Sequence, residues 1–271
     1  MAKRSSFVKS GGGRRRALVT GASAGIGAAF AAQLAREPYD LILVARAQDR
    51  LDALAAQLRA DHQIEVEPLA ADLTDVAQLR VVEEVVAGDD RLELLINNAG
   101  FGTFGPFAES DPNQEETEIR LNVLALVRLT RAALPGMLAR GSGGIINVSS
   151  IAGMQAAPYN ATYGATKAYV SSFTESLHEE LRGSGVRVQA LCPGFTRTEF
   201  QDRAGIDVSR VPAFAWMTPE AVAQASLAAL RRGEIVCIPG VYNRVLATLT
   251  GAVPRSVSRR VAASLVRRFA A

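Results

Sequence analysis

Residues 17–36, ALVTGASAGIGAAFAAQLAR, pass from a short apolar run through a glycine-rich turn into a segment with helical apolar periodicity. This order is typical of a buried strand, a tight turn and a helix. Gly21 permits the bend, Gly25 lets the backbone approach a phosphate group, and Gly27 lets the helix pack closely on the strand. The positive N-terminus of such a helix attracts phosphate. The stretch predicts a dinucleotide-binding unit, and the alternative is an ordinary strand–helix loop.

The same alternation of strand and helix patterns continues to residue 238. An unbroken alternation of strands and helices predicts one α/β domain. The connections between its parallel strands are expected to be right-handed. It should be a doubly wound Rossmann-type parallel sheet in the order 3-2-1-4-5-6-7, with helices on both faces. The later strands are expected at 40–45, 64–69, 92–96, 144–148, 186–191 and 234–238. Helices are expected at 48–61, 75–87, 113–138, from Tyr163 to about 182, and at 219–231.

Residues 149–167, SSIAGMQAAPYNATYGATK, contain a candidate catalytic centre. Tyr163 and Lys167 are four residues apart and therefore share one face of a helix. An ammonium beside a phenol favours the phenolate and lowers its pKa from about 10, which makes Tyr163 a candidate general acid or base. Ser150 follows a buried strand, where its hydroxyl can bond the oxygen of a reacting carbonyl or alcohol. The alternative is a solvated pair on a helix surface.

Lysine usage favours the catalytic interpretation. The chain has 27 Arg but only three Lys, and both Lys3 and Lys9 lie close to the N-terminus. Lys167 is therefore the one lysine in the expected folded domain. The two residue types are not interchangeable where a compact ammonium is needed, so a lysine in a chain that otherwise uses arginine indicates a specific purpose.

Four separated motifs occur in one order: the turn with Gly-x-x-x-Gly-x-Gly spacing, NNAG at 97–100, Ser150, and Tyr163-x-x-x-Lys167. Together they resemble the classical short-chain dehydrogenase/reductase family over residues 16–240. The resemblance implies hydride transfer between a nicotinamide and a carbonyl or secondary alcohol. Tyr163 would transfer the proton of the oxygen, Ser150 would polarise that oxygen, and Lys167 would hold the ribose.

Asn122 and several cofactor contacts follow from the same resemblance. Asn122 would complete a proton relay with Lys167 as a fourth catalytic residue, whereas its alternative is a buried, helix-bending Asn. Ser23 would share a cofactor phosphate, and Asp72 would bind the adenine amino group. The resemblance assigns the other cofactor contacts to Ile26, Leu73, Asn98, Ala99, Gly100, Pro193, Gly194, Thr196 and Thr198, beside the three turn glycines, Tyr163 and Lys167.

Arg46 ends the second expected strand, where a dinucleotide-binding domain meets the adenosine ribose. An acidic residue there binds the 2′-hydroxyl of NAD, whereas an Arg suits the 2′-phosphate of NADP. We therefore expect an NADP(H)-dependent carbonyl reductase. A solvated Arg that caps the turn is the alternative.

Charge is concentrated at the two ends of the chain. The formal net charge is +3, but residues 1–16 carry six cations without an acid, and residues 243–271 carry six more. The remaining body is therefore at −9, which argues against a nucleic-acid-binding protein. Residues 1–15 are expected to be a disordered basic tail. With no signal-peptide pattern and no long apolar run, the protein is expected to be cytoplasmic.

Residues 241–271 lie beyond the family pattern and are expected to form a basic amphipathic helical extension. From Val257 onward the apolar residues share one helical face. Such a face needs a support, either the protein's own substrate side or a partner subunit, or less favourably an anionic membrane surface. The resemblance also implies a homodimer or homotetramer, in which the helices around Asn122 and Tyr163 form the interface. Their apolar residues Leu124, Val127, Val170 and Phe173 exceed what one core needs.

Aromatic residues follow NNAG and recur in residues 199–217, an expected substrate lid, which indicates an apolar substrate. Cys192 and Cys237 lie in apolar runs without metal-ligand spacing, so buried reduced thiols and no metal site are expected. Two other functions remain open. A sugar-nucleotide epimerase or dehydratase shares Tyr-x-x-x-Lys but has a substrate domain, and a cofactor-sensing binding protein would not need all four catalytic candidates.

Overall fold

The computed structural model describes residues 13–205, 208–209 and 211–252. Its centre is a seven-stranded sheet in the order β3-β2-β1-β4-β5-β6-β7, and every pair of neighbouring strands is parallel. The predicted fold and strand order are confirmed. The strands are β1 Arg15–Thr20, β2 Tyr39–Ala45, β3 Val66–Ala70, β4 Leu92–Asn97, β5 Gly143–Val148, β6 Val186–Leu191 and β7 Val236–Cys237.

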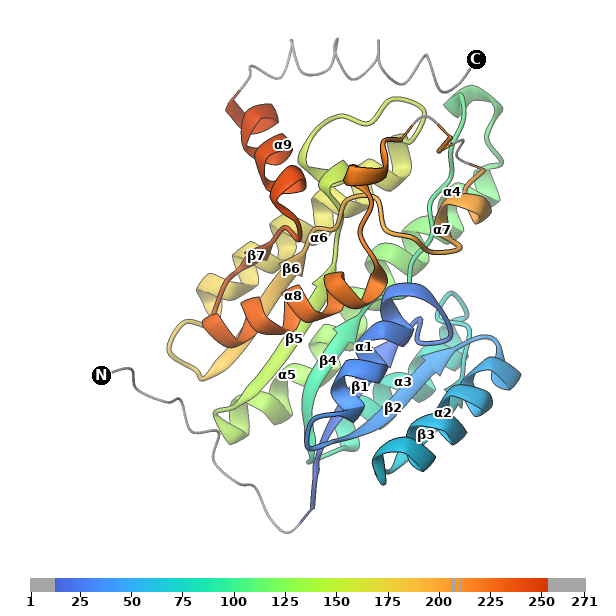
Figure 1. Cartoon of the computed structure of the whole chain (residues 1–271). Coiled ribbons are helices and arrows are strands. Elements are labelled where there is room, and N and C mark those ends of the chain that lie inside the picture. Colours follow the sequence, from blue (N-terminus) through green and yellow to red (C-terminus); the bar gives the residue numbers. More distant parts are fainter. Residues whose placement is uncertain (1–12, 206–207, 210, 253–271) are drawn as a thin grey trace.

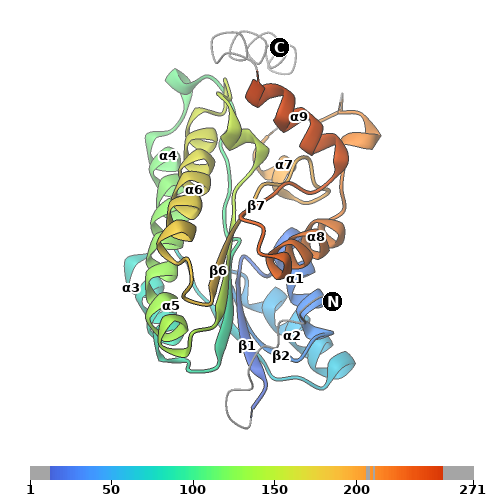
Figure 2. The same ribbon diagram turned by 90° about the vertical axis from the view of Figure 1, so that its left-hand side faces the viewer.

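Helices cover both faces of the sheet (Figures 1 and 2). One face carries α1 Gly25–Ala35, α2 Gln48–His62 and α8 Pro219–Arg232, and the other carries α3 Val76–Gly88, α5 Leu126–Arg140 and α6 Ala161–Glu180. Figure 1 shows the remaining helices, α4 Pro112–Ile119, α7 Phe200–Arg203 and α9 Val241–Ala252, at the upper end of the molecule. Single 3-10 turns lie at Phe107–Glu109, Ile151–Met154 and Ala213–Ala215.

The central strands are buried on both faces, so their side chains alternate between two cores. Val19 and Leu43 pack with the α1, α2 and α8 side chains, whereas Leu18 and Ile42 pack with α3 and α5. All four side chains are fully buried. This two-sided burial explains why these strands read as continuous apolar runs rather than as alternating ones.

Three expected elements differ from the structure. The third strand starts at Val66 rather than at residue 64, and the seventh keeps only Val236–Cys237, which pair with Ala190 and Leu191 of β6. The long helix expected at 113–138 is α4, a π-helical segment at Arg120–Ala125, and α5. Residues 112–140 together are long and apolar enough to cross a membrane by length and composition, but Leu129 and Met137 lie inside the core.

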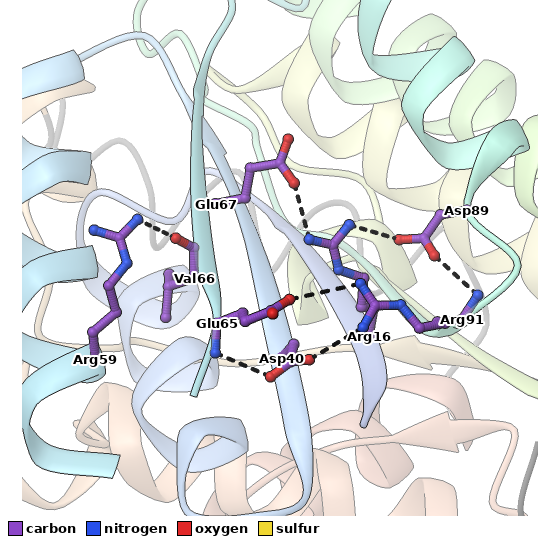
Figure 3. A network of polar contacts seen from close by, with 8 residues as sticks. All are labelled: Arg16, Asp40, Arg59, Glu65, Val66, Glu67, Asp89 and Arg91. Atoms are coloured by element: carbon purple, nitrogen blue, oxygen red, sulfur yellow. Dashed lines mark hydrogen bonds and ion pairs between the residues drawn. The ribbon is translucent and has the colours of Figure 1, made fainter. Parts of the chain in front are cut away.

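The amino-terminal ends of the first four strands are joined by a charged network (Figure 3). Arg16 of β1 pairs with Glu67 at 3.0 Å and with Asp89 at 3.1 Å. The buried Asp40 of β2 accepts a hydrogen bond from the Glu65 backbone N–H at 3.0 Å and pairs with Arg91 at 3.5 Å. This network lies at the amino-terminal ends of the strands, whereas the predicted site lies at their carboxyl-terminal ends. It stabilises the sheet and involves none of the predicted site residues.

Asn97 of β4 connects its strand to a neighbouring strand and to a helix. Its Nδ2 donates to Asn147 Oδ1 of β5 at 2.9 Å and to Thr130 Oγ1 of α5 at 3.0 Å. Asn147 in turn donates to Thr174 Oγ1 of α6 at 3.0 Å. The two cysteines are buried and free, in agreement with the prediction.

Two of the residues expected at a subunit interface lie in or against the core. Val170 is fully buried and Phe173 packs against the core, so neither is surplus apolar surface, which corrects that part of the oligomer argument. The helix predicted from Val257 and the tail at 1–12 lie outside the described residues. Within them, α9 begins at Val241 as the expected extension does.

Candidate active site

The glycine-rich turn lies between β1 and α1, and its shape depends on glycine. Gly21 and Gly25 have φ values of 66° and 55°, which residues with a side chain rarely adopt. A Cβ on Gly21 would lie 2.8 Å from Asn98 Nδ2, and one on Gly25 would lie 2.9 Å from Thr198 Cγ2. The turn is therefore enclosed by residues that follow β4 and β6, which are distant in sequence.

Asn98 and Thr20 lock this turn onto β4. Asn98 Nδ2 donates to Thr20 O at 2.8 Å, and Thr20 Oγ1 accepts from the backbone N–H groups of Asn98 and Ala99 at 2.9 and 3.0 Å. Behind it, α1 has no side-chain cap at its N-terminus. Uncapped amides beside a close-packed glycine cradle fit a dinucleotide phosphate. The residues present thus suit the cofactor that the motif predicted.

The residues expected at the adenosine end lie where β2 and β3 finish. Arg46 directly follows β2, is exposed, and forms no ion pair with a described residue. Asp72 follows β3, and its Oδ1 accepts from the Thr74 N–H and hydroxyl at 2.9 and 2.7 Å. Leu73 is buried beside it, whereas Ser23 is half-buried in the glycine turn.

Tyr163 and Lys167 lie on α6, in contact with the end of β5. Lys167 is buried, and its Nζ donates to the Val148 carbonyl at 2.8 Å. The ammonium lies 5.6 Å from the centre of the Tyr163 ring. Ser150 follows β5, accepts from the Ala152 N–H at 3.1 Å, and hydrogen-bonds the Tyr163 hydroxyl. The structure thus brings the three predicted catalytic side chains together.

Burial governs the ionisation of this pair. It raises the pKa of Tyr163 to about 12, and the Ser150 hydrogen bond opposes that shift only in part. Burial also lowers the pKa of Lys167 to about 8. The prediction that Lys167 lowers the Tyr163 pKa is wrong for this arrangement, because the ammonium is directed at the Val148 carbonyl and desolvation of the phenol dominates. At neutral pH the phenol therefore holds its proton.

Asn122 lies in the π-helical segment between α4 and α5, a helix irregularity that is frequent at functional sites. Its Nδ2 donates to Phe101 O at 2.8 Å and to Thr166 Oγ1 at 3.1 Å, while its Oδ1 accepts from Phe101 N at 3.2 Å. A Cβ on Gly100 would lie 2.8 Å from Asn122 Oδ1 and 3.4 Å from Lys167 Nζ. Asn122 therefore lies next to the lysine, as expected, and also fixes the chain after NNAG.

The segment after β6 joins the catalytic residues to the glycine turn. Pro193 O accepts from the Ile151 N–H at 3.1 Å, next to Ser150, and Thr196 Oγ1 donates to Gly194 O at 3.0 Å. Thr198 contacts the turn at Gly25, as described above. A continuous path of candidate cofactor contacts therefore runs from Tyr163 to α1.

Residues 199–217, the expected lid, begin directly beside the catalytic tyrosine. The Phe200 ring lies 5.4 Å from the Tyr163 ring, centre to centre. Glu199 pairs with Arg50 of α2 at 3.1 Å, so this segment reaches across the glycine turn. The Phe214 ring contacts Tyr242 of α9 at 5.2 Å. One apolar side chain of the expected lid, Phe200, therefore lies beside the ring of Tyr163.

The sequence model of the short chain dehydrogenase family matches residues 15–208, which covers most of the chain. The chain belongs to the short-chain dehydrogenase family. A short-chain dehydrogenase from Sphingobium yanoikuyae, solved in complex with NADPH, is 40% identical with a TM-score of 0.80, and the match covers 89% of this chain and 96% of that one. The bulky-bulky ketone specific alcohol dehydrogenase from Comamonas testosteroni is 32% identical with a TM-score of 0.75, covering 89% and 95%.

Among curated relatives, the very-long-chain 3-oxoacyl-CoA reductase of Anas platyrhynchos is 33% identical over 83% of this chain and 72% of its own length. The matching enzyme of Bos taurus is 35% identical over 68% of this chain, and the match spans 60% of its length. This short-chain dehydrogenase is thus an oxidoreductase that transfers hydride between a nicotinamide dinucleotide and a carbonyl or alcohol carbon. When bound, the cofactor donates or accepts the hydride. Residues of the chain bind the cofactor and transfer the proton of the substrate oxygen.

The sequence did not single out Glu118 as a site residue of this short-chain dehydrogenase. Its side chain is fully buried, and it lies four residues before Asn122, on the same side of the helix. The spacing of one turn from Asn122 is the signal that could have found it, but Glu115 and Glu116 in the same polar segment obscure that signal. No group of three or more metal-binding side chains exists in the described part of the chain.

Proposed function

We propose that this short-chain dehydrogenase reduces an apolar ketone or aldehyde with NADPH. The observation that carries the proposal is the position of buried Tyr163 beside Ser150, with Lys167 5.6 Å from its ring centre and the Phe200 ring of the expected lid at 5.4 Å; burial also raises the pKa of Tyr163 to about 12. A phenol that holds its proton at neutral pH is suited to protonate the oxygen of a carbonyl as hydride reaches its carbon. Ser150 polarises the same oxygen, and buried Lys167 holds the ribose. The solved NADPH complex of a 40% identical relative supports this choice of cofactor.

Consumption of NADPH with a panel of ketones and aldehydes tests the reaction. Apolar substrates such as aryl ketones and long-chain 3-oxoacyl thioesters should be turned over faster than small polar aldehydes. The names of the relatives support both substrate classes, since one relative is specific for bulky-bulky ketones and others are very-long-chain 3-oxoacyl-CoA reductases. Binding of NADPH without turnover of any carbonyl would instead favour the cofactor-sensing alternative.

Arg46 carries the proposed preference for NADPH over NADH. Arg46→Ala should weaken NADPH binding by about 1.5–3 kcal/mol, roughly ten- to a hundredfold, because a charge-assisted contact to the 2′-phosphate is lost, and should leave NADH binding unchanged. Titration of each cofactor by fluorescence measures this. Arg36→Ala, at an exposed cap of α1, is the matched control. An unchanged ratio of the two dissociation constants would show that Arg46 does not read the phosphate.

A homodimer or homotetramer is also proposed. Ile119, Leu124 and Tyr169 are exposed apolar side chains on α4, the π-helical segment and α6. Such neighbouring apolar residues favour a subunit interface. Light scattering at micromolar concentration should give a mass of at least twice 28.7 kDa. Leu124→Arg should lower that mass, whereas Leu138→Arg, on the far end of α5, should not; a monomeric wild type would contradict the proposal.

A cytoplasmic location is proposed from the sequence pattern alone, and cell fractionation tests it. The basic C-terminal extension is a candidate for peripheral membrane contact, and sedimentation of the full chain with anionic vesicles at low salt would reveal that contact. Neither experiment depends on the catalytic proposal.

A further inference from the structure

Glu118 is an acidic residue in a fully buried position. Its side chain is fully buried near the end of α4, and burial of a carboxylate is unfavourable unless partners compensate for it. One oxygen, Oε2, accepts two hydrogen bonds from Thr103, from the backbone N–H and from the hydroxyl, both at 2.9 Å. The other, Oε1, is buried and has no hydrogen-bond partner among the described residues. Such a group calls for a functional explanation.

Thr103 belongs to the loop that follows NNAG and connects Glu118 to the catalytic helix. The Thr103 carbonyl accepts from Asn160 Nδ2 at the N-terminus of α6, and the Gly105 N–H donates to Tyr159 O at 2.8 Å. Glu118 therefore fixes one side of the loop, and the chain that leads into Tyr163 fixes the other.

The same loop forms the wall behind the Tyr163 ring. A Cβ on Gly102 would lie 2.8 Å from Tyr163 Cδ2, so the backbone next to Thr103 is in close contact with the ring. A shift of this backbone would move the ring or leave a gap behind it. Thr103 and Gly102 therefore connect Glu118 to the backbone that contacts the Tyr163 ring.

The charge of Glu118 also acts on both catalytic groups. It raises the pKa of Lys167 and that of Tyr163, while the Lys167 ammonium and Glu115 act on Glu118 in opposite directions. Burial raises the pKa of Glu118 to about 7, and burial lowers that of Lys167 to about 8. The carboxylate is lost as pH falls through about 7, and the ammonium is lost as pH rises through about 8. Both charges are present together mainly between those two values.

We propose that Glu118 is a positioning residue for the Tyr163–Lys167 pair: it anchors the loop behind the Tyr163 ring and places a buried carboxylate one helical turn before Asn122, which lies next to Lys167. The proposal rests on the catalytic roles of Tyr163 and Lys167 given above. It assigns two separable effects to one side chain, one through the Thr103 hydrogen bonds and one through the charge.

Lysine NMR tests the charge effect without any turnover. In a Lys3→Arg, Lys9→Arg background, Lys167 is the only lysine, so one ¹³Cε signal reports its titration. Glu118→Gln keeps the shape and removes the charge, and should move that titration to lower pH. Glu116→Gln is the matched control, because Glu116 is an exposed acid on the same helix, paired with Arg120. An unmoved Lys167 titration in Glu118→Gln would overturn the charge effect, whether or not a substrate is known.

Kinetics test the positioning effect. Thr103→Val removes the hydroxyl hydrogen bond to Glu118, so kcat for ketone reduction by NADPH should fall on the order of tenfold, since small misplacements of a catalytic group are costly. The NADPH dissociation constant should stay at its wild-type value. Because the Thr103 hydroxyl also lowers the pKa of Glu118, the charge effect is measured in Glu118→Gln and not in this variant. Glu118→Gln should in addition move the alkaline limb of the kcat profile to lower pH.

The outcomes separate the two proposals. Wild-type kcat in Thr103→Val together with an unmoved pH profile in Glu118→Gln would overturn the positioning role. If Glu118→Gln does not fold, Thr103→Val and its kcat decide the positioning effect. If no carbonyl is reduced by the wild type, the proposed function fails, and the Lys167 titration still decides the charge effect.

Discussion

Tyr163→Phe is expected to lower kcat for carbonyl reduction by about 10²–10⁴-fold and to leave NADPH binding within about twofold, because it removes the proton donor at the reacting oxygen. The remaining ring keeps its contacts with Gly102 and with Phe200 at 5.4 Å between ring centres. Single-turnover and steady-state rates with an apolar ketone measure the effect. Ser150 cannot replace the phenol as proton donor, because an aliphatic hydroxyl is a much weaker acid than a phenol.

Tyr169→Phe is the matched control for this change. Tyr169 lies on the same helix, is exposed, and stacks on Phe173 at 6.0 Å, away from Ser150. It should keep wild-type turnover. Normal turnover in Tyr163→Phe would remove the tyrosine from the mechanism.

The raised pKa of Tyr163 gives this prediction a pH dependence. The phenol is the acid needed for reduction, and its pKa of about 12 keeps it protonated throughout the neutral range. Reduction should therefore show no loss from tyrosine ionisation near pH 7. Oxidation of an alcohol needs the phenolate, so its rate should rise as pH increases.

Gly27→Ala is expected to have the second largest effect, on cofactor binding and on folding together. A Cβ at this position would overlap the Gly21 carbonyl oxygen and lie 2.6 Å from Asn98 Nδ2, and Asn98 is held by two backbone carbonyls. Neither neighbour is a flexible side-chain end, so the turn must open. Overpacking of this kind costs roughly 1–3 kcal/mol of stability. The phosphate cradle would be lost, and NADPH affinity should fall at least about a hundredfold.

Isothermal titration with NADPH and thermal unfolding measure the two effects of Gly27→Ala. Gly88→Ala provides the control, because a Cβ on Gly88 at the end of α3 meets no atom within 4 Å. That variant should bind NADPH normally and unfold at or above the wild-type temperature. A Gly27→Ala protein with normal affinity would show that the cofactor does not use this turn.

Much of the fold was predictable because its signals are local. The turn glycines and the β6 boundaries at Val186–Leu191 depend on backbone sterics and on apolar runs within a few residues. The strand order followed from the βα alternation and the handedness of crossovers. The seventh strand was predicted too long, because only two of its residues pair with β6 and apolar sequence alone does not report pairing.

The candidate site was predictable in its members but not in its electrostatics. Spacing places Tyr163 and Lys167 on one helix face, and the structure confirms their proximity. The direction of the Tyr163 pKa shift was predicted wrongly, because desolvation outweighs the neighbouring ammonium. Val170 was expected on the surface but lies in the core, since α6 packs on the sheet along that side.

By itself, the sequence determined the order of strands and helices, the glycine turn and the candidates Ser150, Tyr163 and Lys167, since each follows from residues close together in the chain, whereas Asn122 followed from the family resemblance. Only the tertiary structure decided that Glu118 faces the catalytic helix through Thr103, that Asn122 lies in a π-helical segment beside Lys167, and that burial sets the ionisation of Tyr163. The desolvation that shifts a pKa depends on side chains from many segments that are distant in sequence. No local sequence pattern therefore predicts it.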